Sequence, residues 1–359
     1  MKPFSKIRIS LVRATHTLSN SHVLGSSRPF RGKRQLVGVV AVLLGIAVCG
    51  VLATGQVRPG SPSSTQDTAV ARARAAFLKN MSSHRPVVRS TAEKLDASGG
   101  AASFASVNWS GYTDVEGGSN AVSSVSGQWV IPKVQCPIGD YRNQDAFIAQ
   151  WVGLDGVTDG TVEQLGTATQ CFGGVTYYYV WYEMFPFGTV EEGTQACINN
   201  NVDCPEPGDH ISASVTVTQA GGTNNYTLSL TDSTHPAESF SVTASCASST
   251  CLDSSAEWIV ERPAFALPFG FQIVPLVNFF HTGFSNGALT SGGKTTAIEG
   301  FQDGAVYEVQ MSDDTGSYWL DCVGQKGGPA RLLPTSDPSA CPTVSPSHGS
   351  FTTTWDSSF

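Results

Sequence analysis

Polar and aromatic side chains recur on one face of four apolar segments, and these residues could carry chemistry. In each segment the residues alternate with the period of two that a β-strand requires. The residues sharing this face are Trp151, Gly153 and Asp155; Val162, Gln164 and Gly166; Tyr177, Tyr179, Trp181, Glu183 and Phe185; and Glu257, Ile259 and Glu261. Carboxylates can exchange protons, and amides can donate hydrogen bonds. A concave sheet lined in this way would form an aromatic-walled groove that could hold an extended chain.

The elements that must position these residues are β-strands. Residues 210–219, 226–232, 238–245 and 305–312 alternate in the same way, and the Gly- and Asn-rich residues 220–225 indicate a turn. No amphipathic helix longer than about two turns is predicted in this part of the chain. Many short strands with regular turn signals predict an all-β fold, an antiparallel β-sandwich of two sheets.

Six short motifs in these segments resemble a known family. They occur in the order NWSGY, GQWVIP, WVGLDG, EQLG, WYEMFP and SAEWIVE, between residues 108 and 261. One such motif would be a weak indication, but six in this order with similar gaps are specific. Over about residues 105–281 the chain is similar to the glutamic peptidases, the eqolisins.

The resemblance implies a fold and a set of site residues. The family fold resembles a concanavalin A-like, or lectin-like, sandwich of two curved sheets. Its catalytic dyad is a Gln and a Glu on the concave sheet, and the motifs place them at Gln164 and Glu257. The residues expected to bind substrate or support the dyad are Trp109, Trp151, Asp155, Trp181 and Glu183.

Such a dyad suits the hydrolysis of peptide bonds in acid. Glu257 would take a proton from the attacking water and later give it to the leaving amine. Gln164 would stabilise the oxyanion without adding a competing base. Asp155 and Glu183 would orient neighbouring groups or tune this ionisation. The resemblance therefore implies an acid endopeptidase that acts on proteins or peptides, without a cofactor and as a monomer.

Departures from the family pattern leave some properties open. Tyr179 stands where relatives often carry Asp, and Leu165 replaces Thr or Ala, so the pH optimum and subsite preference are undetermined. Two alternative functions also stay open. One is a lectin-like sandwich that binds carbohydrate without catalysis, since this fold type hosts such proteins. The other is an aspartic-type peptidase that uses Asp314, although the Asp-Thr-Gly triplet there has no convincing second copy.

Charge is divided unevenly along the 359 residues. Residues 1–100 hold 15 Lys and Arg against 3 Asp and Glu, a net charge of +12, and residues 101–359 hold 6 against 26, a net charge of −20. Residues 101–359, called the body below, are therefore a poor candidate for nucleic-acid binding, because phosphate contacts need Lys and Arg. The self-repulsion of the body decreases as carboxylates are protonated, which suits an acidic medium.

The positive charge belongs to the N-terminal part of the chain. Basic residues precede an uncharged apolar run, 36–53, that ends in small side chains. This pattern is typical of a secretory signal cleaved after Ala53, and a membrane anchor is the alternative. Residues 54–104 are low in complexity and basic, and no strand is expected from Gln56 to about Gly100. They would form a propeptide bound to the acidic body, or a linker, before a peptidase domain at 105–359.

Cysteine usage agrees with a secreted protein. Cys49 lies in the apolar run, and eight cysteines remain, an even number that indicates disulfides outside the cytoplasm. Local pairing predicts Cys197–Cys204, Cys246–Cys251 and Cys322–Cys341, which leaves Cys136–Cys171. No cysteine pair has the spacing of a zinc site, so no metal centre is predicted.

Overall fold

Strands dominate the part of the chain that can be described. The computed structural model describes residues 81–82, 88–90, 102–116, 118–136, 146–157, 159–172, 175–219, 224–246, 251–267, 270–298, 305–314, 318–323, 333–334 and 347–355. All of them belong to one unit, Ser61–Phe359. The apolar run 36–53 lies outside the described residues, so its predicted role as a signal or anchor stays a prediction. None of the described helices is long and apolar enough to cross a membrane.

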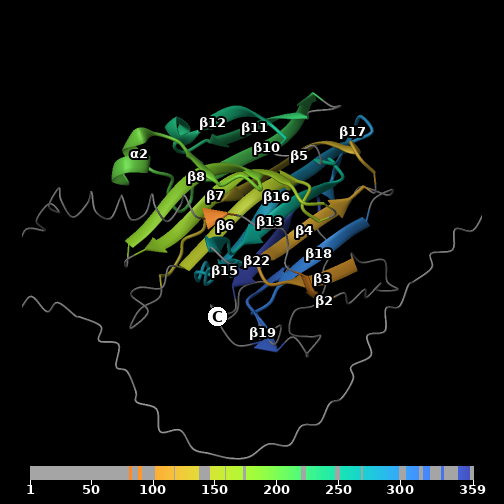
Figure 1. The fold of residues 1–359 in the computed structure, drawn as a ribbon. Coiled ribbons are helices and arrows are strands. Elements are labelled where there is room, and N and C mark those ends of the chain that lie inside the picture. Colours follow the sequence, from red (N-terminus) through yellow and green to blue (C-terminus); the bar gives the residue numbers. More distant parts are fainter. Residues whose placement is uncertain are drawn as a thin grey trace, which may run out of the picture. The chain divides into compact units, whose positions relative to one another are not determined.

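A nine-stranded sheet contains the four segments that carry the candidate residues (Figure 1). Its order is β2 (Val88–Ser90), β3 (Ala102–Ser106), β18 (Ala305–Met311), β4 (Trp109–Val115), β13 (Ser255–Glu261), β6 (Ala146–Leu154), β7 (Val162–Phe172), β8 (Val175–Phe185) and β9 (Val190–Glu192). All neighbours are antiparallel except β3 and β18, which are parallel. The long central strands are thus joined edge to edge.

A second sheet of eight strands forms the other layer (Figure 1). Its order is β12 (Phe240–Ser245), β11 (Asn225–Asp232), β10 (His210–Gln219), β5 (Val122–Val130), β16 (His281–Ser291), β22 (Phe351–Trp355) and β20 (Asp321–Val323), with β17 (Lys294–Ala297) beside β16. Smaller sheets join β1 (Met81–Ser82), β14 (Ala264–Leu267) and β15 (Gly270–Ile273), and β19 (Tyr318–Trp319) with β21 (Leu333–Pro334). The predicted sandwich is confirmed.

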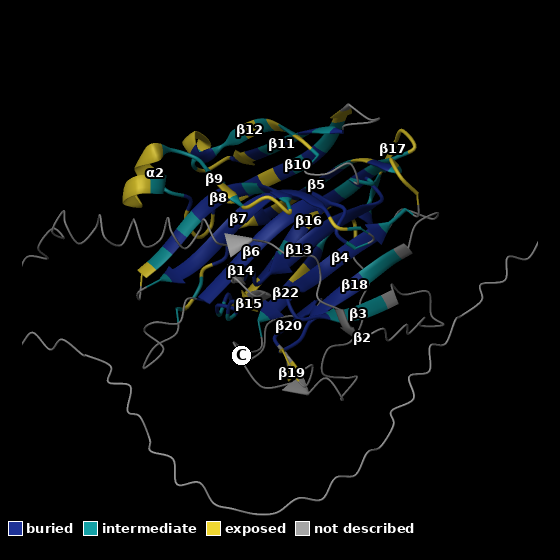
Figure 2. Cartoon of the chain, viewed as in Figure 1, coloured by how far each residue is buried: buried dark blue, intermediate teal, exposed yellow. Residues whose placement is uncertain are grey.

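The main core lies between the two sheets, because each sheet turns one apolar face inward. Tyr226, Leu228 and Leu230 of β11 are buried, and so are Leu165 of β7 and Trp258 of β13. The nine-stranded sheet is also buried on its opposite face, so its central strands are dark along their whole length in Figure 2. That second face holds a separate cluster that includes Trp109, Trp151 and Trp181.

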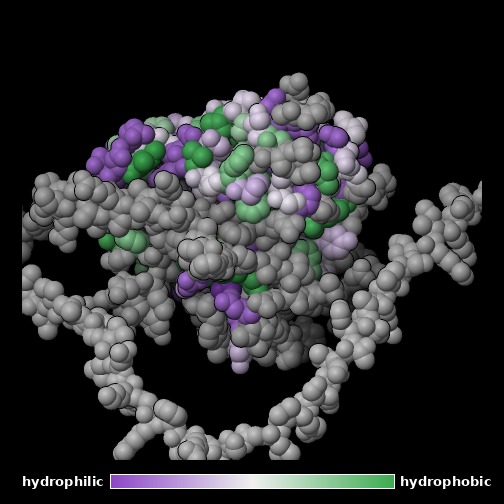
Figure 3. All heavy atoms as spheres, in the orientation of Figure 1, coloured by the Kyte–Doolittle hydropathy of each residue, from purple (hydrophilic) through white to green (hydrophobic). Residues whose placement is uncertain are grey.

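Helical structure is confined to short segments among the described residues. Helix α2 (Gln195–Asn200) begins at Thr194, whose side chain accepts a hydrogen bond from the Cys197 backbone N–H. A 3₁₀ turn, η1, covers Pro236–Glu238. Hydrophilic side chains gather over α2 at the upper left of Figure 3, so this helix lies at the solvent-exposed edge of the sandwich.

Strands β1 and β2 contradict the expectation that residues 56–100 form no strand. Strand β1 pairs with β14, and β2 pairs with β3. These strands form because the folded body offers unpaired strand edges, a tertiary effect that local composition does not reveal.

The described disulfides follow the predicted local pairing. Cys136–Cys171, Cys197–Cys204 and Cys246–Cys251 are formed. Cys322 is also disulfide-bonded, while its predicted partner Cys341 lies outside the described residues. The Cys246–Cys251 bridge closes the connection into β13, and Cys136–Cys171 anchors the end of β7.

The close pairing of β6 and β7 generates a stability prediction. A Cβ at Gly166 would lie 2.0 Å from the Gln150 carbonyl oxygen and 2.7 Å from the Trp151 Cβ. Gly166→Ala should therefore lower the free energy of unfolding by about 1–3 kcal/mol or more in urea denaturation, because the two strands must separate. Gly160→Ala is the matched control, since nothing lies within 4 Å of its Cβ. Equal stability of the two variants would contradict this account of the pairing.

Candidate active site

Four strands of the nine-stranded sheet bring the predicted dyad into one row. In the antiparallel register, Glu257 of β13 lies opposite Gly153 of β6. Gly153 lies opposite Gln164 of β7, and Gln164 lies opposite Glu183 of β8. Directly opposed residues point to the same face of a sheet. Glu257, Gln164 and Glu183 thus share the face that is turned away from the eight-stranded sheet.

Gly153 stands between the two members of the dyad, and the Trp151 ring and the Gln164 side chain pack against it. The two members of the dyad stand two strands apart, which corresponds to about 9–10 Å between their Cα atoms. A Cβ at Gly153 would lie 3.0 Å from the Trp151 ring and 3.1 Å from the Gln164 Cβ, so a larger residue would crowd both neighbours. The row therefore has a carboxyl group and an amide on either side of a position without a side chain.

Glu183 orients the amide of Gln164. The Gln164 Nε2 donates a hydrogen bond of 3.1 Å to the Glu183 Oε2, and both side chains are fully buried. Within the described residues the Gln164 Oε1 has no hydrogen-bond partner. One N–H of the amide is thus fixed on Glu183, and the second N–H is available for another acceptor.

Glu257 is a carboxyl group in an apolar, acidic environment. It has no exposed surface, and neither oxygen has a hydrogen-bond partner among the described residues. Burial raises the pKa of Glu257 well above its ordinary value, and the charges of Asp155, Asp159 and Asp114 act in the same direction. The Ser255 hydroxyl opposes this shift. Burial of Glu257 in the full chain therefore favours the neutral form of this carboxyl group.

Aromatic rings flank the dyad on the same face. In the adjacent row Trp151 lies opposite Ile259 on one side and Gly166 on the other, and Gly166 lies opposite Trp181. Trp109 packs edge to face on Trp151, with ring centroids 4.9 Å apart. All three tryptophans predicted from the sequence therefore lie beside the dyad. They line one side of the row with flat apolar surfaces.

Glu261 is a site residue that sequence reasoning did not assign a role. It accepts a 2.7 Å hydrogen bond from the Trp151 indole N–H and lies opposite Trp109 in the sheet. This contact fixes the tilt of the Trp151 ring next to the dyad. The signal was present in the sequence, because Glu261 shares a strand face with Glu257.

Asp155 is placed differently from the prediction. Alternation put it on the face of Trp151 and Gly153, but its backbone is left-handed, with φ of 68°, and the alternation ends at Leu154. Its carboxylate instead accepts hydrogen bonds from the backbone N–H groups of Leu252, Asp253 and Ser254. Asp155 thus holds the loop that leads into β13, on the side of the sheet opposite the dyad.

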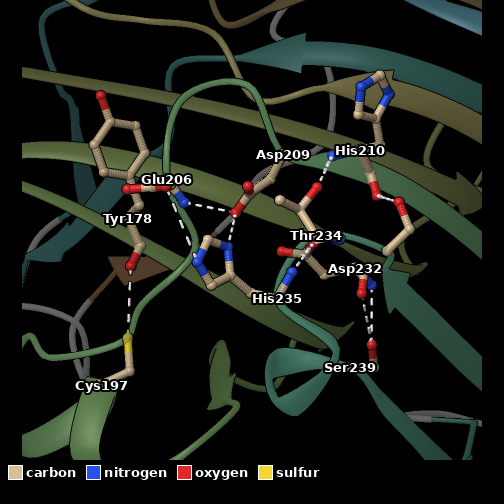
Figure 4. Close-up of polar contacts among 10 residues, drawn as sticks. Tyr178, Cys197, Glu206, Asp209, His210, Asp232, Thr234, His235 and Ser239 are labelled. Atoms are coloured by element: carbon tan, nitrogen blue, oxygen red, sulfur yellow. Dashed lines mark hydrogen bonds and ion pairs between the residues drawn. The ribbon is translucent and has the colours of Figure 1, made fainter.

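Two groups of side chains among the described residues are close enough to share a metal ion. One is Asp155, Glu163 and Asp253, and the other is Glu206, Asp209 and His235. In the second group the His235 Nδ1 lies 2.8 Å from the Asp209 Oδ2, and the Nε2 faces Glu206 at 4.0 Å (Figure 4). Both ring nitrogens of His235 face carboxylates. These contacts join the loop before β10, which carries Glu206 and Asp209, to the β11–β12 connection, which carries His235.

Asp314, the basis of the aspartic alternative, does not lie in the row. It is exposed and forms an ion pair with the buried Arg262, whose Nε also donates to the Val107 carbonyl. An aspartic dyad needs two carboxyl groups that share a proton. Asp314 instead pairs with the positive charge of Arg262.

Comparison with known proteins identifies the family of this chain. The family model of the peptidase A4 family matches residues 107–325. Among solved structures, the aspergilloglutamic peptidase from Aspergillus niger is similar at 21% sequence identity, with 58% of this chain and 99% of that chain covered and a TM-score of 0.39. No curated protein matches the chain.

The matched region contains every strand of the candidate row and more than half of the chain. A match to a peptidase family supports a catalytic function rather than the lectin-like alternative, which binds carbohydrate without catalysis. The family and the disulfides also indicate an extracellular protein. The chain belongs to the peptidase A4 family, the glutamic peptidases or eqolisins, and is an endopeptidase of that family.

Proposed function

We propose that the protein is a secreted endopeptidase that cleaves proteins in acid through Glu257 and Gln164. The observation that carries this proposal is the row in which these two side chains flank Gly153 on one sheet face. A substrate carbonyl and an attacking water would bind between a proton acceptor and an amide donor once the part of the chain that buries the dyad is displaced.

Each group in the row has a defined task in this mechanism. Ionised Glu257 removes a proton from the water as the water attacks the carbonyl carbon. The free N–H of Gln164 donates to the oxyanion, while Glu183 keeps the amide in the required orientation. Protonated Glu257 then transfers the proton to the leaving amine, which restores the carboxylate.

Trp109, Trp151 and Trp181 supply the surface on which an extended substrate binds. Their rings lie on the dyad face, and Glu261 holds Trp151 in place. Flat aromatic surfaces bind many different side chains, so this arrangement favours broad selectivity in the neighbouring subsites.

Residues 54–104 act in this proposal as an inhibitory propeptide. The segment is basic and the body is acidic, so the two attract each other at neutral pH. Strand β1 is hydrogen-bonded to β14, which begins three residues after the end of β13. In the full chain Glu257 and Gln164 have no exposed surface, so substrate can reach them only after part of the chain is displaced.

Substitution of the dyad tests the mechanism. Glu257→Gln should lower kcat on a denatured protein at pH 3–5 by at least about 10³-fold, because the proton acceptor is lost. Gln164→Ala should lower it by about 10²–10³-fold, the usual cost of removing one oxyanion donor. Initial rates of peptide release, measured with pepstatin present, provide the comparison.

Asp314→Asn is the control variant, and it should retain wild-type activity because Asp314 pairs with Arg262 away from the row. Full activity of the two dyad variants would overturn the mechanism. Loss of activity in Asp314→Asn alone would favour the aspartic alternative. Glycan binding by a wild-type protein that cleaves nothing would favour the lectin.

Acid processing tests the role assigned to residues 54–104. A chain that starts at residue 54 should be inactive and intact at pH 7, and at pH 4 it should cut itself within 54–104 and become active. Protonation of the body weakens the attraction to the basic segment, which frees the dyad. The same chain with Glu257→Gln should stay intact in acid, as N-terminal sequencing and mass spectrometry of the products will show. Equal activity of intact and truncated chains would contradict an inhibitory role.

A further inference from the structure

Glu206, Asp209 and His235 gather where β10 begins and β11 ends, outside the row that holds the dyad (Figure 4). One ligand atom from each lies within 4.8 Å of the others. The side chain of Asp209 is 1% exposed, that of His235 is 31% exposed and that of Glu206 is 66% exposed. This group, called the His235 cluster below, is thus anchored in the protein at Asp209 and open to solvent at Glu206.

Hydrogen bonds fix the backbone on both sides of the His235 cluster. In the loop before β10, the Glu206 N–H donates to the Asp209 Oδ2 at 2.8 Å, and the Asp209 N–H donates to the Glu206 carbonyl at 3.1 Å. In the β11–β12 connection, the His235 N–H donates to the Asp232 Oδ1 at 2.8 Å, and the His235 carbonyl accepts from the Glu238 N–H at 2.9 Å. The ligating side chains therefore project from an ordered backbone, which lowers the entropic cost of binding an ion.

The separation of the ligand atoms fits a first-row metal ion. Zn²⁺ holds nitrogen and carboxylate oxygen ligands at about 2.0–2.2 Å, so neighbouring ligand atoms lie roughly 3.0–3.5 Å apart. The His235 Nδ1 and the Asp209 Oδ2 are 2.8 Å apart, so a small displacement would make both of them ligands of one ion. The Glu206 Oε1 lies 4.0 Å from the His235 Nε2, and this exposed side chain can rotate towards the ion.

A further carboxyl group beside the cluster lacks a hydrogen-bond donor. Asp232 has no exposed surface, and its Oδ2 has no partner among the described residues. Burial raises the pKa of Asp232, the backbone N–H groups of His235 and Thr234 oppose this, and the charge of Asp209 and a side-chain contact with Asp209 raise it further. A buried carboxylate oxygen without a partner is costly. A cation bound to Asp209 would supply the positive charge that this oxygen lacks.

The carboxyl groups outnumber the cationic groups at this place. Glu206, Asp209 and Asp232 contribute three carboxyl groups, and His235 contributes one imidazole. Within the part of the chain that the structure describes, no Lys or Arg side chain forms an ion pair with any of these carboxylates. A divalent cation would balance the excess of negative charge, and the exposed side of the cluster gives it a path from solvent.

We propose that Glu206, Asp209 and His235 bind one Zn²⁺ ion, which joins the loop before β10 to the β11–β12 connection. Imidazole is a ligand that suits Zn²⁺, whereas Ca²⁺ and Mg²⁺ prefer oxygen ligands alone. Water or the Asp232 Oδ2 would complete the coordination. The ion stabilises the fold, and the proposed dyad acts without it. Cysteine spacing could not reveal such a site, because His235 and Asp209 lie 26 residues apart in the sequence.

Isothermal titration calorimetry with ZnCl₂ tests the site on the full chain after dialysis against EDTA. The titration is made at pH 7.5, because an imidazole nitrogen must be unprotonated to bind a metal. We expect one Zn²⁺ per chain with a micromolar Kd. At a free Zn²⁺ concentration of about 100 times Kd, the Tm should rise by about 5–10 °C. His235→Ala should weaken binding by at least about 10–100-fold, because even an outer-shell partner of a metal is worth this much.

His210→Ala is the matched control variant. His210 is an exposed histidine that follows Asp209 directly, and its ring points away from the His235 cluster in Figure 4. Its removal should leave the Kd and the rise in Tm unchanged. Glu206→Gln removes a ligand from an exposed position and should weaken binding as His235→Ala does. This second variant decides the matter if His235→Ala does not fold.

Three results would overturn the proposal. Absence of binding at millimolar Zn²⁺ would show that the contacts of His235 with Asp209 and Glu206 are ion pairs only. An equal loss of binding in His210→Ala and His235→Ala would show adventitious binding to surface histidines. Binding of Ca²⁺ as tight as that of Zn²⁺, and unchanged in His235→Ala, would show a site made of carboxylates alone.

Discussion

The register of four antiparallel strands is the constraint on which the rest of this structure depends. Side chains alternate across a sheet with a period of two, so a slip of one residue would turn a whole strand over. Only the observed pairing of β13, β6, β7 and β8 puts Glu257, Gln164 and Glu183 on one face and in one row. Both faces of the central strands are buried, which penalises any other register.

This register requires glycine at two positions, Gly166 and Gly153. Gly166 allows β6 to pass close to β7, where any Cβ would collide with a carbonyl oxygen. Gly153 has no side chain at the centre of the row, and the Trp151 ring lies against it. The site is thus defined as much by missing side chains as by the groups that flank them, and the large tryptophans fill the neighbouring row instead.

Burial of carboxyl groups links the site to the overall charge of the protein. Burial raises the pKa of Glu257 and Glu163 well above the ordinary value, and the pKa of Asp155 to about 7. A raised pKa means that folding is most favourable when the carboxyl group is neutral. The excess of negative charge in residues 101–359 adds electrostatic repulsion at neutral pH. The acidic composition and the burial of these carboxyl groups therefore both favour stability of the folded chain in an acidic medium.

The sequence by itself determined the fold class, the family, the local disulfide pairing and the faces of the central strands, since alternation and short motifs are local patterns. Alternation put Glu257 and Glu261 on the same strand face, and Gln164 and Glu163 on opposite faces, without any knowledge of strand pairing. Tertiary structure decided the row, because Glu257 is paired with Gly153, which lies more than a hundred residues earlier in the chain. It also decided the turn of Asp155 away from the dyad, where a left-handed backbone ends the alternation. The strands β1 and β2 were not predictable, because they form only on the edges that the folded body provides.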